Sequence, residues 1–402
     1  MKYEAEASGL RISAPVDGVR ESMRRLPGAF AVPLTLLTGK PHAGQRPVRF
    51  TPTSHLINAI CSTTAGLTIS CLALASGGLA LFALPAGWAV TLHGLRNLRM
   101  MIYHQCAHRN MWRRRRPDDL LGRVIAALLI VQRFDDYRAE HVADHHALHH
   151  MTVRDPTVRA FLIGLGLQPR MSRREMWSRV LRLLASPVFH VRFLTSRIRS
   201  HVKGMSREER VWTFAGYATV AGLATWLQLW PFVLIAWIVP VTVLFQVSNT
   251  LRLCVKHTFP LPGQTDRRGR AYFCSLTNAI FIGEPAPDPR LPGGHRALAW
   301  LRWCARLAVV HFPARYLVLT GDTVCHDFHH RHPMDRRWAD YIFEREARLA
   351  SLTPGDPHYR HVWGLIPAID VVFDSLRAAD PMEYSRELAA AEHHDVFAAF
   401  DD

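Results

Sequence analysis

From Leu56 to Leu95 the chain reads LINAICSTTAGLTISCLALASGGLALFALPAGWAVTLHGL, without a single Asp, Glu, Lys or Arg. The sequence Leu84-Pro85-Ala86-Gly87 interrupts this apolar stretch. A helix of roughly 20 apolar residues spans the hydrocarbon core of a bilayer. Residues 56–84 exceed that length and residues 87–103 are near its lower limit. The stretch therefore predicts two membrane helices joined as a hairpin.

A second charge-free run covers residues 211–251 and contains Pro231 and Pro240. It is long enough for two further spans joined by a tight turn around Leu229-Trp230-Pro231. A soluble protein that buries two helical hairpins is the alternative interpretation. The usual hydropathy rule favours membrane spans for charge-free runs of this length.

Basic residues flank both hairpins at every end. They are Arg46, Arg49, Arg109, Arg113 to Arg116, Arg207, Arg210, Arg252 and Lys256. Because loops rich in Lys and Arg stay on the cytoplasmic side of a membrane, we expect all four ends to lie in the cytoplasm.

The expected fold class is an all-α, multi-pass integral membrane protein with four transmembrane helices in two hairpins and a cytoplasmic helical cap. The expected segments are a cytoplasmic N-terminal part (1–53), the first hairpin (54–103), a cytoplasmic segment (104–210), the second hairpin (211–251) and a cytoplasmic C-terminal part (252–402). Residues 120–132 and 296–320 are too short or too basic to cross, and we expect them to lie along the membrane surface.

The formal net charge of +16 does not indicate nucleic acid as a partner, because zinc-finger spacing, an RNP-type aromatic box and a basic zipper are all missing. Anionic lipid and an acidic redox partner fit the basic residues better. The seven cysteines are scattered and form no CxxC pair. This pattern argues against a disulfide framework and against a thiolate metal site. The first 50 residues contain no long apolar segment, so a cleaved signal peptide is not expected.

More than half of the 23 histidines fall in four short stretches. These are His104-Gln-Cys-Ala-His108, Glu140-His141-Val-Ala-Asp144-His145-His146-Ala-Leu-His149-His150, Lys256-His257 and His326-Asp-Phe-His329-His330-Arg-His332. Residues three and four apart on a helix project from one face, so two such imidazoles can hold one metal ion. Neutral imidazole is a ligand for iron, zinc and copper. A single HxxxH pair is a weak signal, but the whole set is too large for one ion and fits two.

This arrangement resembles the membrane fatty acid desaturase and hydroxylase superfamily, in which histidine boxes follow transmembrane hairpins. The resemblance covers roughly residues 56–365. Tyr137-Arg138-Ala-Glu-His141 is similar to the start of the family's second box, and Asp155-Pro156 to the DP that follows it. Arg252-Leu-Cys-Val-Lys256-His257 resembles an element that supplies an extra ligand before the third box, although it has Lys256 where that element usually has Glu.

The second box departs from the family's HxxHH pattern and leaves two ligand sets open. His141, His145 and His146 form a box that is one residue longer, and the lead-in at Tyr137-Arg138 favours this set. His146, His149 and His150 form the literal HxxHH. On the favoured ranking, His150 is not a ligand. Glu140 makes the longer box similar to the EHxxxHH of integral-membrane alkane hydroxylases.

The resemblance implies a non-haem centre of two iron ions that uses O2 and two external electrons to attack an unreactive C–H bond. The implied ligands are His104, His108, His141, His145, His146, His257, His326, His329 and His330. Asp327, Glu140 and Asp144 lie beside them and are candidates for fixing imidazole orientation. The implied activity is desaturation of an acyl or alkyl chain, with hydroxylation of an alkyl or lipid substrate as the alternative.

A metal-binding transport protein is a more remote alternative, because transported ions bind near the middle of the membrane whereas these histidines follow the span ends. A zinc hydrolase would use only three or four protein ligands. Neither paired CxxC motifs nor an HPGG motif is present, so we expect a separate electron donor of the ferredoxin or cytochrome b5 type. It would dock on basic residues of the cytoplasmic face, namely Arg113 to Arg116, Arg170, Arg173, Arg174, Arg197 and Arg199.

Overall fold

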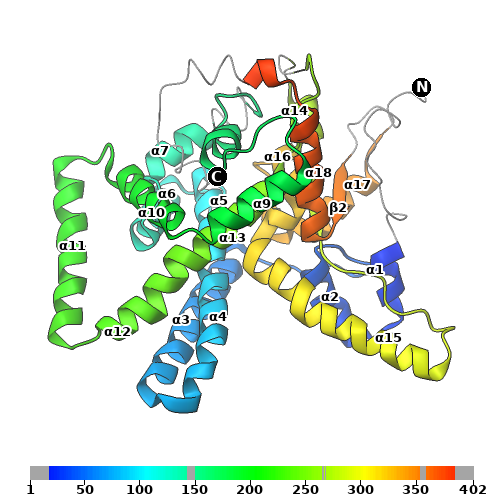
Figure 1. Ribbon diagram of the computed structural model, residues 1–402, viewed down its shortest axis with the longest axis horizontal. Helices are drawn as coiled ribbons and strands as arrows, with labels where there is room; N and C mark the ends of the chain where they lie inside the picture. The colour runs from blue at the N-terminus through cyan, green and yellow to red at the C-terminus, as the bar shows by residue number, and fades with distance from the viewer. Residues whose placement is uncertain (1–17, 143–149, 265–266, 268, 354–358, 385–402) are drawn as a thin grey trace.

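The computed structural model describes residues 18–142, 150–264, 267, 269–353 and 359–384 (Figure 1). Its α-helices are α1 (Gly18–Ser22), α2 (Ala31–Thr38), α3 (Pro52–Ser76), α4 (Leu84–Asn97), α5 (His104–Ala107), α6 (Arg115–Leu129), α7 (Phe134–Ala139), α8 (Pro156–Arg159), α9 (Arg173–Leu184), α10 (Pro187–Val202), α11 (Arg207–Trp226), α12 (Trp230–Phe232), α13 (Phe245–Lys256), α14 (Arg270–Ser275), α15 (Gly293–Arg306), α16 (His326–Arg331), α17 (Tyr341–Ala350) and α18 (Leu365–Ala378).

Shorter helical turns connect or extend these helices. The π-helical turns are η4 (Leu98–Tyr103), η6 (Ala160–Gly164), η7 (Val233–Ile238), η8 (Pro240–Leu244), η9 (Leu307–His311) and η10 (Ala314–Val318). The 3-10 turns are η1 (Met23–Arg25), η2 (Gly28–Phe30), η3 (Gly78–Ala83), η11 (Gly321–Cys325) and η12 (Trp338–Asp340). Two short parallel strands, β1 (Asn278–Phe281) and β2 (Arg360–Trp363), pair with each other. The structure thus confirms the expectation that the chain is mostly helical.

Helices α3 and α4 form the first hairpin, and small residues let them approach closely. Thr51 and Ser54 cap the start of α3, since the side chain of each accepts a hydrogen bond from the backbone N–H of the other. A methyl group added at Gly66 would collide with Thr91, and one added at Gly94 would collide with Thr63. Small residues of this kind drive helix packing in a membrane, where lipid offers no hydrophobic force between helices.

We expect Gly94→Ala to destabilise this hairpin by about 1–3 kcal/mol, the usual cost of overpacking. The added methyl group would meet the Thr63 hydroxyl and the Ala59 carbonyl. Thermal unfolding of the detergent-solubilised chain should show a lower Tm. Gly216→Ala is the matched control, because Gly216 lies in α11 with open space around it, and Ala is the better helix former. Equal Tm changes in the two variants would contradict the packing argument.

In the part of the chain that the structure describes, three helical runs are long and apolar enough to cross a membrane, namely Pro52–Ser76, Gly78–Ala107 and Trp230–Lys256. Helix α11, the expected fourth span, is not among them. Its charge-free part, residues 211–226, rises about 24 Å at 1.5 Å per residue. That length is short of the ~30 Å hydrocarbon core. The prediction of four spans therefore stays a prediction.

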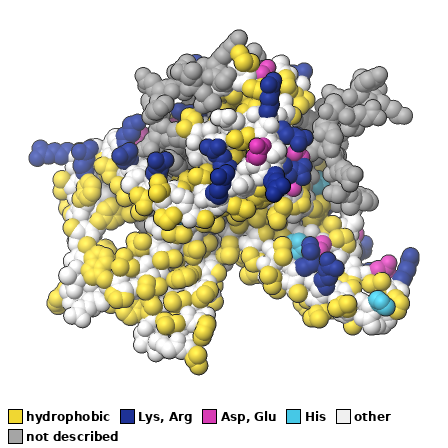
Figure 2. Space-filling model, in the orientation of Figure 1, with side chains coloured by type: hydrophobic (Ala, Val, Ile, Leu, Met, Phe, Trp, Pro, Cys, Tyr) yellow, Lys and Arg dark blue, Asp and Glu magenta, His cyan; other side chains and the backbone are white. Residues whose placement is uncertain are grey.

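The outer surface of these helices is apolar. Helix α11 stands apart from α3 and α4 and leads into α12 (Figure 1), and it contacts α6 through the Tyr217 hydroxyl, which donates to the Ala127 carbonyl at 2.8 Å. It exposes 71% of Trp212 and 78% of Trp226, and its one buried residue is Ala224. Figure 2 shows apolar side chains covering α3, α4, α11 and α12, with most Lys and Arg side chains gathered above them. An apolar surface of this size indicates that the protein associates with a membrane.

The second and third apolar runs both lead to one end of the molecule, which we call the histidine end. His104 follows η4 in the second run, and His257 follows α13. Both lie against α16, with ring centroids 4.2 Å from His104 to His329 and 4.9 Å from His257 to His326. The chain thus leaves α4 at the histidine end and enters α12 at the opposite end. Helix α11 makes the return between them (Figure 1).

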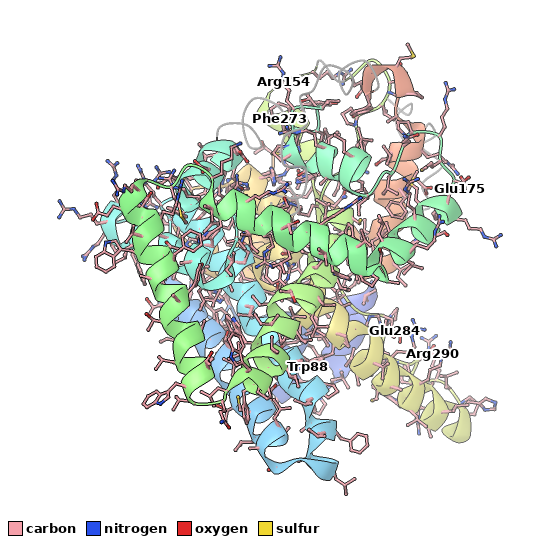
Figure 3. All side chains as sticks on the ribbon, turned by 60° about the vertical axis from the view of Figure 1, so that its left-hand side comes forward. Trp88, Arg154, Glu175, Phe273, Glu284 and Arg290 are labelled. Atoms are coloured by element: carbon pink, nitrogen blue, oxygen red, sulfur yellow. The ribbon has the colours of Figure 1, made fainter. Side chains whose placement is uncertain are left out.

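One expectation about a surface residue is corrected by the structure. Arg197 is 1% exposed, and its guanidinium donates to the carbonyls of Ile130 and Val241, so it ties α10 to the body of the protein and is not part of a docking surface. Trp88 is half-buried and its Nε1–H donates to the Ile235 carbonyl at 2.8 Å, which joins α4 to η7 (Figure 3).

Candidate metal centre

The structure brings seven of the expected ligands together in two buried groups. The first group is His104, His108, His141 and His329, and the second is His257, His326 and His330. Within each group the potential ligand nitrogens all lie within 4.8 Å of one another. His145 and His146 lie outside the described residues.

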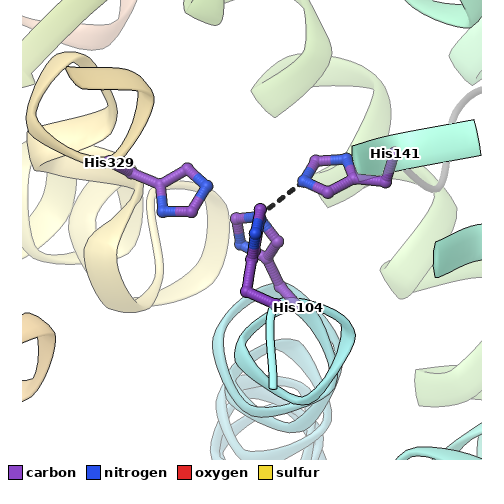
Figure 4. Close-up of side chains that lie close together, drawn as sticks. His104, His141 and His329 are labelled. Carbon is purple, nitrogen blue, oxygen red and sulfur yellow. Dashed lines mark hydrogen bonds between the residues drawn. The ribbon is translucent and has the colours of Figure 1, made fainter. Parts of the chain in front are cut away.

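The first group joins three elements that are distant in sequence. His104 and His108 are four residues apart at α5, with ring centroids 5.1 Å apart. His141 follows α7, and its Nε2 lies 2.8 Å from the Nε2 of His104. The ring of His329 on α16 approaches from the other side (Figure 4). The His141 ring also stacks on Tyr137 at 5.0 Å, so the aromatic residue of the expected box holds the imidazole in place.

The second group has a histidine whose tautomer is fixed by its neighbours. His257 Nδ1 lies 3.2 Å from the Thr277 hydroxyl, which donates its own proton to the Phe273 carbonyl. The hydroxyl must then accept the Nδ1–H of His257, so Nε2 carries the lone pair. That Nε2 lies 3.1 Å from the Nε2 of His326. A backbone bridge between His257 and Thr277 supports this arrangement.

Helix α16 serves both groups, and its helical geometry explains how. Successive residues on an α-helix point about 100° apart, since a turn takes 3.6 residues. His326 and His330 therefore share one face and join the second group, with ring centroids 4.6 Å apart. His329 is rotated about 60° around the helix from His326 and about 100° from His330, and it joins the first group.

His150 lies beside the second group, a position that the favoured sequence ranking missed. It is 2% exposed, and its ring centroid lies 4.6 Å from that of His257 and 5.2 Å from that of His330. It also packs against Phe273, which lies on the far side of the molecule from Trp88 (Figure 3). His141 thus lies in the first group, and His150 lies next to the second.

Asp155 is the acidic residue beside His150, and the Asp-Pro pair was the sequence signal for it. Its carboxylate is fully buried, with Oδ2 3.7 Å from His150 Nδ1. The same carboxylate accepts the backbone N–H groups of Met151 at 2.7 Å and Thr157 at 2.8 Å. It therefore fixes the turn after His150 and caps the start of α8.

A buried ion pair anchors α16. Both oxygens of Asp327 accept hydrogen bonds from Arg345 of α17, at 2.7 Å and 2.9 Å. Burial alone would lower the pKa of Arg345, but the Asp327 carboxylate holds that pKa above its usual value. Because Asp327 lies between His326 and His329, this pair fixes the helix that supplies ligands to both groups. Glu140, the other acidic candidate, accepts instead from Gln132 at 2.8 Å.

Asp322, in η11 just before α16, is a further buried carboxyl group near the histidine groups. Burial raises the pKa of Asp322 to about 6, and the charge of Arg252 opposes that shift. Gln105 donates to Asp322 at 3.3 Å, which links the element bearing His104 to η11 before α16. Arg252 in turn donates its Nε–H to the Thr323 hydroxyl at 3.1 Å.

The donor set fits metal ions bound by imidazole. Two ligands at right angles around an ion, with bonds of about 2.1 Å, have nitrogens about 3 Å apart. The Nε2–Nε2 separations of 2.8 Å and 3.1 Å agree with that value. Burial raises the pKa of the Cys325 thiol, so this neighbour remains a neutral thiol and not a thiolate ligand. Within the described residues, the two groups contain imidazole alone.

The comparison with known families agrees with this geometry. Residues 78–284, just over half of the chain, match the family model described as fatty acid desaturase. The match includes His104, His108, His141 and His257 and ends before α16. No curated protein matches the chain. The chain belongs to the fatty acid desaturase family, a family of membrane-associated oxidoreductases known for using two iron ions.

Proposed function

We propose that the chain is an O2-dependent di-iron desaturase that introduces a double bond into an acyl or alkyl chain. The observation that carries this proposal is the pair of adjoining buried histidine groups, joined through α16 at the end of two apolar helical runs. Neutral imidazole suits iron. The family match adds the reaction class.

Iron bound in these groups would supply the oxidation of an unreactive C–H bond by O2. Desaturation removes two hydrogens from the substrate and, with two electrons and two protons from a donor, reduces O2 to two waters. The chain's own residues hold the imidazoles in position. Thr277 orients His257, Tyr137 stacks on His141, and the Asp327–Arg345 pair fixes α16. His145 and His146 complete the proposed ligand set.

An ion-transport function is less well supported by the same positions. His257 follows the end of α13, and α16 is separate from all three apolar runs. A transported ion is expected near the middle of the membrane, within the spans. The proposed ligands lie at or beyond the span ends, which favours an enzyme that works at the membrane boundary.

A separate electron donor of the ferredoxin or cytochrome b5 type would deliver the electrons. Arg113 and Arg114 are exposed between α5 and α6, and Arg115 and Arg116 are exposed in the first turn of α6, close in sequence to His108. A run of four exposed guanidinium groups would attract an acidic partner by long-range electrostatics. Such docking weakens steeply as salt screens the charges.

The proposed topology has four crossings with both histidine groups in the cytoplasm. Since α4 and α13 both end at the histidine end, α11 has to cross for the chain to enter α12 from the opposite side. Single cysteines at Ala86 and Leu229, in a background without exposed native cysteines, should react with a membrane-impermeant maleimide from outside intact cells. Cysteines at Asp119 and Asp288 should react only after lysis. Labelling of Asp119→Cys from outside would contradict the shared cytoplasmic face.

Mass spectrometry of lipids from cells that express the protein tests the reaction. Products that lack two hydrogens support desaturation, and products that gain one oxygen support the alternative, hydroxylation. The control is His329→Ala, which removes a proposed ligand and should yield neither product. Products that persist unchanged in His329→Ala would contradict a reaction at this centre.

A further inference from the structure

A cavity of about 260 Å³ lies beside the first hairpin, separate from both histidine groups. Its walls are the start of α3, the second half of α4, η10 and the chain that leads into α17. None of the proposed ligands lines it. Drug-sized ligands occupy roughly 300 Å³ or more. A cavity of this size therefore takes one end of a molecule and not a whole lipid. We call it the hairpin pocket.

Two residues of α4 give the hairpin pocket a fixed, uncharged wall. His93 Nδ1 lies 2.9 Å from the Tyr316 carbonyl, which can only accept a hydrogen bond. His93 Nε2 lies 3.1 Å from the amide nitrogen of Asn97, which also donates to the His93 carbonyl. One ring nitrogen thus donates and the other accepts, as in a neutral imidazole. Both N–H groups of the Asn97 amide are used here, which leaves its oxygen as an acceptor.

The opposite wall adds a donor and a second acceptor. His55 Nε2 donates to the Ala339 carbonyl at 2.8 Å, so Nδ1 is left as an acceptor. The Tyr341 hydroxyl accepts from Arg315 at 3.1 Å. Burial raises the pKa of Tyr341 to about 12, so the hydroxyl keeps a proton that it can donate. The rings of His55 and Tyr341 lie 6.2 Å apart, close enough to act on one polar group.

The two charged residues of the hairpin pocket already form hydrogen bonds with other groups of the protein. Arg315 donates from Nε to the Leu36 carbonyl at 2.9 Å and from its terminal nitrogens to carbonyls of Leu319 and Gly321. Asp340 accepts from Arg49 at 3.1 Å and from the backbone of Phe50 at 2.6 Å. Binding a carboxylate or phosphate normally takes a free pair of guanidinium N–H groups. This pocket therefore favours an uncharged polar group.

We propose that the hairpin pocket binds the uncharged polar end, a hydroxyl or carbonyl group, of a lipid-like ligand. Ser54 and Asn58 are exposed at its rim on α3, and Ile57 beside them is 55% exposed toward the surrounding apolar surface. The polar end enters at this rim and the hydrocarbon part lies along the apolar surface of α3. This binding site goes beyond the proposed function and does not depend on the metal centre.

Binding of labelled 1-dodecanol to the full chain in lipid nanodiscs, above that of empty discs, tests the proposal. We expect saturable binding that is stronger than that of dodecanoate or dodecane. Tyr341→Phe and His55→Leu each remove one hydrogen-bonding group and should raise the Kd about tenfold, which corresponds to about 1.4 kcal/mol. His190→Leu is the matched control, because His190 makes the same kind of bond, 2.8 Å from Nε2 to the Leu184 carbonyl, outside the pocket.

The control and His329→Ala should both leave the Kd unchanged. Loss of binding in His329→Ala would assign the ligand to the metal centre and overturn the proposal. Dodecanoate binding more tightly than dodecanol, or a Kd that Tyr341→Phe and His55→Leu leave unaltered, would overturn it as well. Because binding is measured without turnover, these results hold whether or not the chain desaturates a substrate.

Discussion

Replacing His104 or His257 by Ala should lower the iron content from about two per chain to one or fewer and reduce turnover more than 100-fold. The two substitutions test the two groups separately, since His104 belongs to the first and His257 to the second. Loss of a residue that merely orients a ligand typically costs about 10–100-fold, and loss of a ligand should exceed that range. Elemental analysis and product formation are measured on the same preparations.

His332→Ala is the control for this experiment. His332 follows α16 but lies outside both groups, with its Nε2 3.3 Å from the Tyr359 hydroxyl. It should keep its iron and most of its activity. A protein that holds one zinc and no iron when made with iron available would contradict the di-iron proposal. Full iron content in both His104→Ala and His257→Ala would remove these residues from the ligand set.

The apolar runs could be predicted from the sequence because a membrane span needs little beyond length and the lack of charge. Both predicted runs are present, but the break between them was misplaced: α3 ends at Ser76 and the second run starts at Gly78, whereas Pro85, at the predicted break, lies in the first turn of α4. Whether α11 spans the membrane was harder to predict from the sequence. Its apolar part is short for a membrane span. The support for a crossing comes from the positions of its two ends, and these depend on how α4 and α13 pack together.

The histidine groups were predictable where helical spacing alone decides the geometry. His104 and His108, or His326 and His330, lie four residues apart and share a face. Helical geometry also explains why His329 and His330 point in different directions. It does not predict that the two residues join different groups. That assignment depends on His104 of α5 meeting His329 and on His257 after α13 meeting His326, which is a tertiary arrangement without a local signal.

The hairpin pocket, in contrast, could not be predicted from the sequence. His55 and His93 lie in different helices and outside every histidine box, and sequence spacing gave them no role. They line one cavity with Tyr341, almost 300 residues along the chain from His55, because α3, α4 and the start of α17 pack together. No periodicity within a short window could predict such a juxtaposition.

The second box illustrates why a motif can be recognised while its ligands remain ambiguous. Five histidines within residues 141–150 offer two overlapping sets with helical spacing. The chain places His141 at one metal group and His150 at the other. The position of His150 depends on the turn that Asp155 fixes through the backbone of Met151 and Thr157. This turn follows the box, so spacing inside the box cannot predict it.

Accordingly, both His141→Ala and His150→Ala should abolish turnover, each with loss of iron from its own group. His141 lies 2.8 Å from His104, and His150 packs against His257 and His330.

The variant Asp155→Asn tests the orientation of His150 separately. It keeps an acceptor oxygen for only one of the two backbone N–H groups and removes the charge beside the imidazole, so activity should fall about 10–100-fold while iron is largely retained. Turnover close to that of the unaltered protein in His150→Ala would return the box to His141, His145 and His146. Loss of activity in His150→Ala but not in His141→Ala would instead favour His146, His149 and His150. Loss in both, with Asp155→Asn intermediate, is the result that the two-group arrangement predicts, because each imidazole then serves a different ion.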